Sequence, residues 1–142
     1  EHAVLAGHEI GYNMLWNETA DTAIPYACWG NFNGDARTDI ALMLVPKRAD
    51  TTKSRMLFWK AVVLHRTKDS YDVVNLDETQ NFACPECIIR TRPPGVIQPF
   101  PETGKEVPVR VEHDMIDWYY WGKAGGVLYW DGHQYQKILT LD

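Results

Sequence analysis

The sequence predicts a mainly β protein, β-rich α+β or all-β, with an antiparallel sheet or meander of about six to eight strands and at most a short N-terminal helix. The prediction rests on runs of β-branched and aromatic residues, on Asn-Gly and Asp-Gly turns between such runs, and on apolar–polar alternation in the last third of the chain. The 142 residues, 45% of them hydrophobic, match a single domain spanning residues 1–142 with enough apolar surface to form a core.

The first third predicts a short helical turn and a strand, followed by a hairpin. Apolar residues in 3–16 fit both helical and alternating spacing. A short apolar run at 26–32 leads into the turn residues Asn33-Gly34-Asp35, and residues 40–45 form an unbroken apolar strand. We expect this second arm of the hairpin to be buried.

The middle of the chain predicts a second hairpin and then a loop. Residues 55–66 and 71–76 are rich in β-branched and aromatic residues, and Lys68-Asp69-Ser70 supplies turn chemistry between them. Prolines recur between Cys84 and Pro108, and proline cannot donate a hydrogen bond to a sheet. This segment is therefore predicted to be a long, partly stiff loop.

The last third predicts a three-stranded meander. Its strands are expected at 109–121, 127–130 and 135–141, with Asp131-Gly132 as a tight turn.

The charge of the chain restricts its partners. A formal net charge of -5 argues against nucleic acid, since nucleic-acid binders concentrate Lys and Arg, and favours a basic partner. No apolar run approaches the roughly 20 residues that span a bilayer, so membrane insertion is not expected. The chain begins at Glu1 without Met, as a precursor does after removal of a signal peptide, although a chain trimmed at its N-terminus begins in the same way. We expect a periplasmic location.

The segment from Asn31 to Asp39 places side-chain oxygens at loop positions 1, 3, 5 and 9, a spacing that can surround one calcium ion. The ligands would be Asn31, Asn33, Asp35, the backbone carbonyl of Arg37, and Asp39. A hairpin turn that bonds to itself is the favoured alternative. An EF-hand is excluded because Leu42 stands where its bidentate Glu belongs.

This segment resembles the calcium loop of FG-GAP and VCBS-type repeats, which reads Asp-x-Asn-Gly-Asp-Gly-x-x-Asp before a buried strand. Asn31 replaces the first Asp and Ala36 the second Gly, which lowers the expected affinity for calcium. The ending 126–138 is similar to that of small, single-copy, exported proteobacterial proteins. Some of these accompany cell-wall toxins, so the resemblance implies a role as an immunity protein of type VI secretion.

The three cysteines predict one disulfide in an oxidising compartment, either Cys84 to Cys87 or Cys28 to one of that pair; we favour Cys84 to Cys87. The Cys-x-x-Cys spacing also suits a redox dithiol or half a zinc site. The residues after Cys87 do not predict the helix that a redox dithiol needs, and no second paired motif completes a zinc site.

Catalysis is not expected. The two serines, Ser54 and Ser70, lie in turn-like stretches outside any Gly-x-Ser-x-Gly elbow. A glycosidase pair would have to come from a set of carboxylates that includes Asp114 and Asp117, and we expect these two on the solvent face of a strand. Glu102 and Glu112 complete the set.

Two features predict a binding surface. Trp118 and Tyr120 share one strand face, and Tyr119 and Trp121 the other, so one pair can fill the core while the other anchors a partner; the alternative is that all are core. The proline segment from Pro93 to Pro108 is preorganised for docking, or else is a connector lying against the sheet. The predicted partner-binding residues are Pro93, Pro94, Gly95, Val96, Ile97, Gln98, Pro99, Phe100, Trp121 and His133.

We therefore expect a non-catalytic, exported immunity or inhibitor protein that occludes the active site of a toxin, a basic peptidoglycan hydrolase. An envelope module that binds calcium or glycans is the alternative, and a hydrolase is a weaker third.

Overall fold

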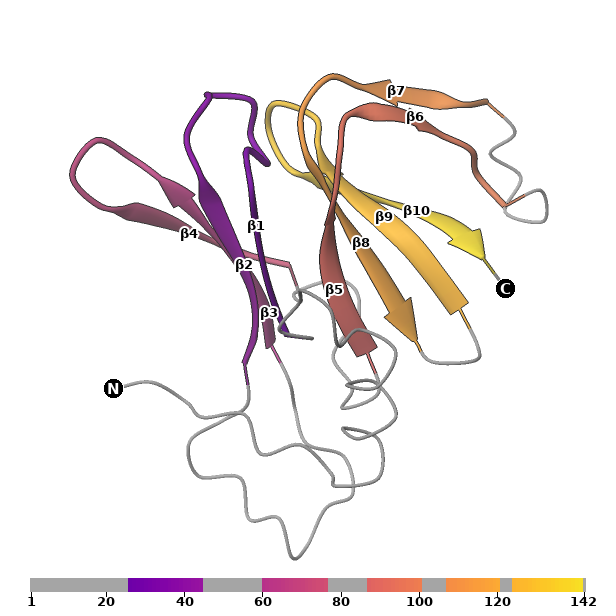
Figure 1. Ribbon diagram of the computed structural model, residues 1–142, viewed down its shortest axis with the longest axis horizontal. Helices are drawn as coiled ribbons and strands as arrows, with labels where there is room; N and C mark the ends of the chain where they lie inside the picture. Colours follow the sequence, from indigo (N-terminus) through magenta and orange to yellow (C-terminus); the bar gives the residue numbers. More distant parts are fainter. Residues whose placement is uncertain (1–25, 45–59, 77–86, 101–106, 121–123, 142) are drawn as a thin grey trace, which may run out of the picture.

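The computed structural model describes residues 26–44, 60–76, 87–100, 107–120 and 124–141. These residues form ten strands and no helix, arranged in two four-stranded sheets and one two-stranded sheet with every pairing antiparallel (Figure 1). The predicted β class is confirmed. The helical turn predicted in 3–16 lies outside the described residues, and within them no helix is long and apolar enough to cross a membrane.

The first sheet, sheet A, contains both hairpins predicted in the first half of the chain. Its strand order is β1-β2-β3-β4. A loop joins β1 to β2, and a short turn joins β3 to β4. The pairing of β2 with β3 places apolar residues of the two strands next to each other. The strands are β1 (Ala27–Gly30), β2 (Asp39–Leu44), β3 (Lys60–Arg66) and β4 (Tyr71–Asn75).

The second sheet, sheet B, has the order β10-β9-β8-β5. The consecutive strands β8, β9 and β10 form the predicted meander. β5 comes from the proline-rich segment and pairs with β8, where Ile89 lies opposite Trp118. The strands are β5 (Cys87–Arg92), β8 (Met115–Tyr120), β9 (Ala124–Trp130) and β10 (Tyr135–Leu141).

The third sheet, sheet C, corrects the prediction for the proline-rich segment. It pairs β6 (Gly95–Ile97) with β7 (Val109–Val111). The segment predicted as a loop thus contributes β5 and β6, because Pro93 and Pro94 stand between the two strands and interrupt neither ladder. The single strand predicted over 109–121 is divided into β7 and β8. These differences raise the strand number in the described residues above the expected six to eight.

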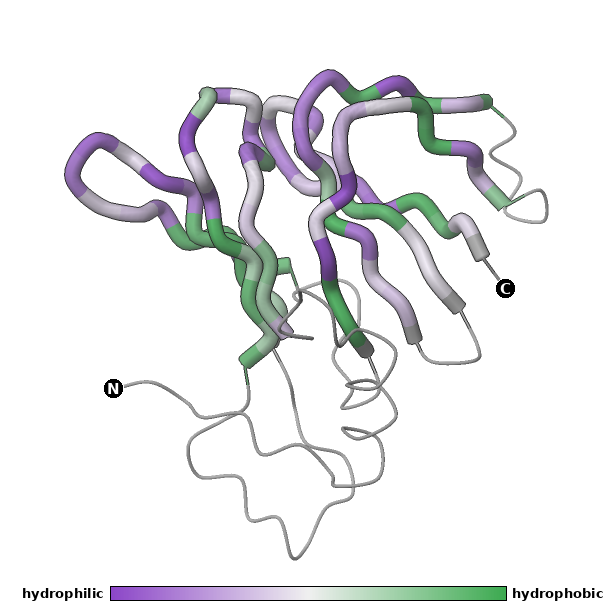
Figure 2. Tube along the Cα trace, viewed as in Figure 1, coloured by the Kyte–Doolittle hydropathy of each residue, from purple (hydrophilic) through white to green (hydrophobic). Residues whose placement is uncertain are grey.

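The three sheets form three layers. Sheet A faces one side of sheet B across a core that contains Phe32, Met43, Val63, Ile116 and Trp118. Sheet C covers part of the opposite side of sheet B through a second core cluster of Ile97, Val111, Met115, Val127 and Ile138. Hydrophobic residues follow the strands within the layers, and hydrophilic residues gather in the turns at the top (Figure 2). The buried position of Trp118 confirms that one face of its strand is core.

Candidate functional site

Three turns meet at one end of the sheets, which we call the loop end. They are the β1–β2 loop (31–38), the β7–β8 turn (112–114) and the β9–β10 turn (131–134), all at the upper edge of Figure 1. Each turn is held by side-chain hydrogen bonds, described below, and further bonds join the turns to one another.

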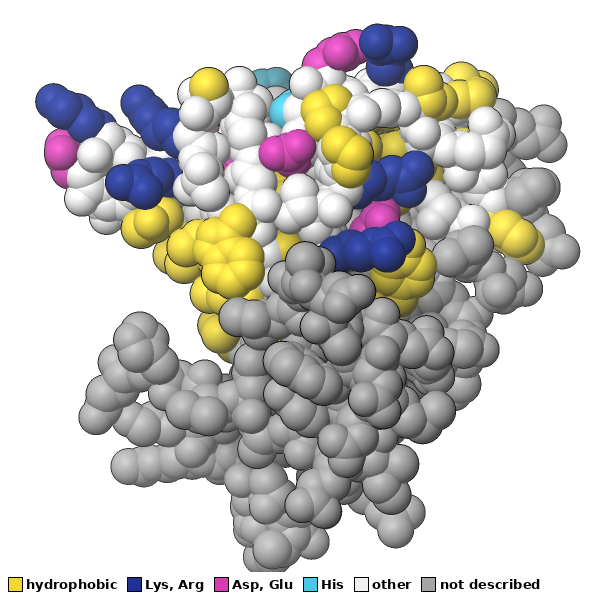
Figure 3. Space-filling model, in the orientation of Figure 1, with side chains coloured by type: hydrophobic (Ala, Val, Ile, Leu, Met, Phe, Trp, Pro, Cys, Tyr) yellow, Lys and Arg dark blue, Asp and Glu magenta, His cyan; other side chains and the backbone are white. Residues whose placement is uncertain are grey.

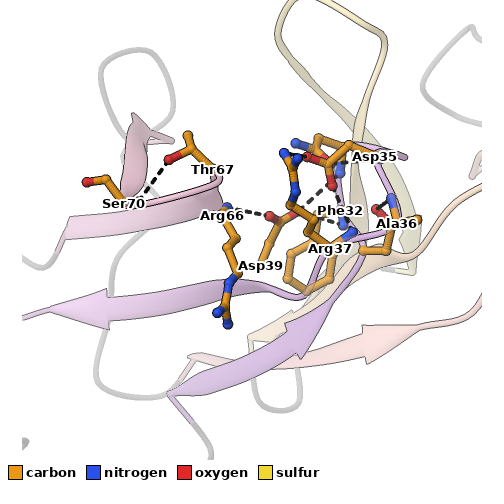
Figure 4. A network of polar contacts seen from close by, with 10 residues as sticks. Phe32, Asp35, Ala36, Arg37, Asp39, Arg66, Thr67 and Ser70 are labelled. Carbon is orange, nitrogen blue, oxygen red and sulfur yellow. Dashed lines mark hydrogen bonds and ion pairs between the residues drawn. The ribbon is translucent and has the colours of Figure 1, made fainter.

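The β1–β2 loop bonds to its own backbone. Asn31 Oδ1 accepts from the N–H of Ala36 at 3.1 Å, and Asn33 Oδ1 accepts from the N–H of Asp35 at 3.0 Å. Asp35 Oδ1 accepts from the N–H of Arg37 at 2.9 Å, and its other oxygen lies 3.3 Å from the Arg37 guanidinium (Figure 4). Ala36 has a φ of 65°, a left-handed conformation that favours the glycine of the similar calcium loops. The loop therefore turns tightly on hydrogen bonds between its own residues.

Asp39 ties this loop to the next strand of the sheet. Its side chain is fully buried, and Oδ2 accepts from the N–H groups of Phe32 at 2.9 Å and Asn33 at 3.3 Å. Oδ1 accepts from the N–H of Arg66, at the end of β3, at 2.8 Å (Figure 4). Both oxygens of the carboxylate are thus used by the backbone.

The side chains proposed as calcium ligands, those of Asn31, Asn33, Asp35 and Asp39, lie in or beside this loop, and their oxygens accept from backbone N–H groups. Within the described residues, no group of three or more His, Cys, Asp or Glu side chains is placed to hold a metal. The arrangement matches the self-bonded turn, the alternative that the sequence favoured. Calcium binding stays a prediction.

The β7–β8 turn links the loop to sheet B. Asp114 Oδ2 accepts from the N–H of Asn31 at 2.8 Å, and the N–H of Asp114 donates to the carbonyl of Asn31 at 3.2 Å. The ring nitrogens of His113 each lie 3.0 Å from a carbonyl oxygen, one of Asp114 and the other of Trp130. A side chain on Gly34 would lie 3.3 Å from the His113 ring, so the two turns are in contact. These contacts fix three turns relative to one another.

The β9–β10 turn is organised by Asp131. Its Oδ1 accepts from the N–H groups of Gln134 and His133 at 2.9 Å, and its Oδ2 accepts from the Gln136 amide at 2.6 Å. These bonds, above all that from Gln134, lower the pKa of the carboxyl to about 2. The turn keeps its shape at neutral pH, and it presents His133 on the surface.

The predicted docking segment is split between surface and core. Pro93, Pro94, Gln98 and Val96 are exposed, Val96 at 51%, while Gly95 and Phe100 are half-buried. Ile97 is fully buried in the core under sheet C, and Pro99 is also buried, so neither is free to contact a partner. Strand alternation is the cause, since the Ile97 side chain points toward sheet B and that of Val96 away from it. Trp121 lies outside the described residues.

Cys28 is a free thiol buried in the core. The alternative in which Cys28 joins a disulfide is therefore wrong. Cys84 lies outside the described residues, so the pair Cys84 to Cys87 stays a prediction. Burial raises the pKa of the Cys28 thiol to about 12, and the smaller effect of the Thr91 hydrogen bond opposes this shift. The thiol stays protonated at neutral pH.

Among the described residues, the carboxylates considered for glycoside hydrolysis have different partners. Asp117 is buried, which corrects its predicted place on a solvent face, and its oxygens lie 3.2 Å from Arg90 and 3.3 Å from Arg92. The Tyr119 hydroxyl also contacts Arg90. Asp114 holds Asn31, as described above. Glu112 is exposed and accepts from Arg110 at 2.6 Å, and Glu102 lies outside the described residues.

Sequence reasoning missed a polar contact between the two large sheets. His65 on β3 and Tyr135 on β10 form a hydrogen bond of 2.8 Å, and the Trp130 ring meets the His65 ring edge to face at 5.0 Å. Burial lowers the pKa of His65, an effect opposed by the carboxylates of Asp39, Asp35 and Asp72. Burial also raises the pKa of Tyr135 far above its usual range. No local pattern signals a pair that is 70 positions apart.

Comparison with protein-family models, with curated protein sequences and with solved structures gave no match. The site is therefore interpreted from its geometry.

Proposed function

We propose that the chain is a non-catalytic, exported binding protein that neutralises a peptidoglycan-degrading toxin in the periplasm by covering its active site. The contact surface is the loop end together with the exposed side of the β6–β7 hairpin. The observation that supports this most is the set of hydrogen bonds that joins three turns through Asn31, His113 and Asp114. The polar side chains of the loop end hold its shape, as a docking surface requires.

A rigid surface favours tight binding because little conformational freedom is lost on docking. The exposed side of sheet C adds apolar contact area through Val96, and Val107, which precedes β7 and is 75% exposed, adds more. An inhibitor of this kind needs affinity and shape, and no reactive group.

The charge of the surface supports a basic partner. Among the described residues of this surface, the four carboxylates of Asp35, Glu112, Asp114 and Asp131 outnumber the two guanidinium groups of Arg37 and Arg110. A surplus of negative charge speeds association with a basic cleft and selects against acidic partners.

The test is inhibition of a candidate hydrolase encoded beside this chain. Clearing of a peptidoglycan suspension by the hydrolase is measured with increasing amounts of wild-type chain or of Val96→Lys, with the chain alone as a blank. Val96→Lys removes an apolar contact and adds a like charge toward a basic partner, so we expect at least tenfold weaker inhibition. Val73→Lys is the matched control, because it makes the same change at an exposed valine of sheet A.

The proposal requires that wild type inhibits, that Val73→Lys inhibits equally and that the chain alone clears nothing. Equal inhibition by wild type and Val96→Lys would show that Val96 is not part of the contact surface. Clearing by the chain alone, or capture of no protein partner from a periplasmic extract or from neighbouring gene products, would contradict the proposal.

A further inference from the structure

A group of polar side chains lies on the side of sheet B that also carries sheet C. Arg90 and Arg92 come from β5, and Asp117 and Tyr119 come from β8; we call these four residues the arginine cluster. Ladder pairing places Arg92 opposite Met115, which belongs to the core beneath sheet C, and Arg90 opposite Asp117. Because side chains alternate along a strand, all four side chains of the cluster share this face. Figure 3 shows basic and acidic side chains next to each other over the region of β5 and β8.

Two guanidinium groups share one buried carboxylate in this cluster. Arg90 Nε lies 3.2 Å from Asp117 Oδ2, and Arg92 Nη1 lies 3.3 Å from Asp117 Oδ1. The side chain of Asp117 is 8% exposed, whereas those of Arg90 and Arg92 are 56% and 34% exposed. The carboxylate therefore anchors the two guanidinium groups from below, and the guanidinium groups are the part of the cluster that a ligand can reach.

Tyr119 holds the more exposed arginine in place. Arg90 Nη2 donates to the Tyr119 hydroxyl, and the Arg90 guanidinium lies over the Tyr119 ring, 4.6 Å from its centroid. The Tyr119 hydroxyl in turn donates to Asp117 Oδ2 at 3.4 Å. Hydrogen bonding and ring stacking together reduce the freedom of the Arg90 side chain, so a ligand that binds here costs less side-chain entropy.

The charges of the cluster do not balance. The two guanidinium groups meet the single carboxylate of Asp117, and neither arginine forms an ion pair with any other described residue. One positive charge is left over, on a chain whose formal net charge is -5. The cluster is therefore a local positive site on an acidic protein, which attracts an anion.

Arg92 keeps one edge of its guanidinium group for such an anion. Its bond to Asp117 uses Nη1, which leaves the N–H of Nε and the neighbouring N–H of Nη2. Within the described residues, no acceptor contacts these two donors. The two N–H groups on this edge are parallel, and their spacing matches the two oxygens of a carboxylate.

We propose that the arginine cluster binds the carboxylate of a ligand, with Nε and Nη2 of Arg92 donating to its two oxygens and Arg90 adding its charge. A monovalent carboxylate brings the cluster to neutrality. A phosphate dianion would leave the cluster negative, with the additional charge close to Asp117, so charge balance favours the carboxylate. Peptide C-termini and acidic sugars both carry this group.

The test is a titration of the full, 15N-labelled chain followed by NMR at low salt. The probes are acetyl-alanyl-alanine, its C-terminal amide, glucuronate and inorganic phosphate. For acetyl-alanyl-alanine or glucuronate we expect a saturable shift of the Arg92 Nε–H resonance, with a dissociation constant of about 10 mM or lower. The amide lacks the second oxygen and the charge, so it should bind about tenfold more weakly or worse. The tighter of the two acids identifies the source of the carboxylate as peptide or sugar, and either result supports the site.

Variants locate the site on the cluster. Arg92→Gln should weaken binding about tenfold or more, followed through the backbone amides of β5 and β8. Arg92→Lys keeps the charge without the parallel donors, so its dissociation constant should lie between those of wild type and Arg92→Gln. Arg66→Gln is the matched control, because it removes an exposed arginine from sheet A, and it should bind as wild type does. Circular dichroism and melting temperature check that each variant is folded.

Several results would overturn the proposal. They are no saturable shift of the Arg92 resonance with either acid up to about 100 mM, equal binding of the acid and its amide, or tighter binding of phosphate than of both acids. Equal loss of binding in Arg92→Gln and Arg66→Gln would show that any exposed arginine suffices. The comparison of acid with amide uses wild type alone, so it decides even if an Arg92 variant does not fold. The proposed inhibitory surface is the loop end and sheet C, so failure of inhibition leaves this proposal intact, and the reverse holds.

Discussion

Asp39 is a buried carboxylate whose partners are backbone amides. Removing a charge from water is costly unless hydrogen bonds replace the lost hydration. Three N–H groups do so here, two from the β1–β2 loop and one from Arg66 at the end of β3. At the scale of the residue, Asp39 is therefore a structural link between a surface loop and the sheet beneath it.

Replacing Asp39 by asparagine should be strongly destabilising. The amide presents an NH2 group where an oxygen accepted, which leaves at least one buried N–H without its bond. We expect Asp39→Asn to lower the free energy of unfolding by about 3 kcal/mol, measured by urea denaturation. Asp35→Asn, at an exposed loop position, is the control and should cost about 0.5 kcal/mol or less. Equal losses in both variants would contradict the role given to Asp39.

Gly126 is required by close packing on β9. A Cβ atom there would lie 2.5 Å from the Ile138 carbonyl oxygen and 2.9 Å from Trp118 Nε1. Gly126→Ala should therefore lower the free energy of unfolding by about 2 kcal/mol, because the backbone of the neighbouring strand must move. Gly95→Ala, which meets nothing within 4 Å, should change stability by about 0.5 kcal/mol at most. Thermal unfolding of both variants checks this, and a destabilised Gly95→Ala would argue against the packing explanation.

At the scale of elements, a hydrogen-bonded side-chain pair, His65 and Tyr135, connects β3 of sheet A to β10 of sheet B. The imidazole of His65 lies between the hydroxyl of Tyr135 and the ring of Trp130, in a buried position that favours its neutral form. This contact makes the docking of the two sheets sensitive to protons.

The sign of the pH dependence follows from the direction of the shift. The pKa of His65 in the folded protein is lowered below 6.5, so the unfolded chain takes up a proton first as the solution is acidified. The contribution of His65 to stability is complete above pH 6.5 and is lost as the pH falls toward the folded pKa. We expect the free energy of unfolding, measured in urea from pH 7.5 to 5, to decrease over this window.

The control for this prediction is His65→Gln, which keeps a polar group and removes the titration. Its stability should change less with pH than that of wild type over the same range. If the free energy of unfolding changes equally with pH in both proteins, His65 is not the group responsible for the pH dependence.

At the scale of the whole molecule, sheet C is a structural layer as well as a candidate contact surface. Ile97 contributes a fully buried side chain to the core between sheets B and C. Its neighbour Val96 faces the opposite way and is half exposed. The β6–β7 hairpin therefore cannot detach from sheet B to enter a partner's cleft without disrupting that core.

Truncating Ile97 should consequently weaken the whole fold. We expect Ile97→Ala to lower the free energy of unfolding by about 3 kcal/mol in one cooperative transition, followed by tryptophan fluorescence and circular dichroism. Val96→Ala should cost about 0.5 kcal/mol or less. A separate early transition in Ile97→Ala would mean that sheet C unfolds independently.

The sequence by itself determined the β class, the two early hairpins and the final meander. These features depend on the alternation of apolar and polar residues and on turn residues within a few positions of each other, such as Asp131-Gly132 before β10. They can therefore be predicted from short stretches of sequence. The same local evidence wrongly predicted a loop for the proline-rich segment. A local pattern does not distinguish prolines that lie beside a strand from prolines that prevent a strand from forming. The sequence did identify the loop from Asn31 to Asp39 as a turn that bonds to itself.

Only the tertiary structure decided which faces meet and which side chains reach the surface. Asn31 and Asp114 are 83 positions apart, and the burial of Asp117 depends on β5 pairing with β8. The exposure of Val73 on β4 likewise depends on what the other described strands cover. The physical reason is that burial and pairing are set by distant parts of the chain, whereas a local pattern records only the preference of each segment for strand or turn.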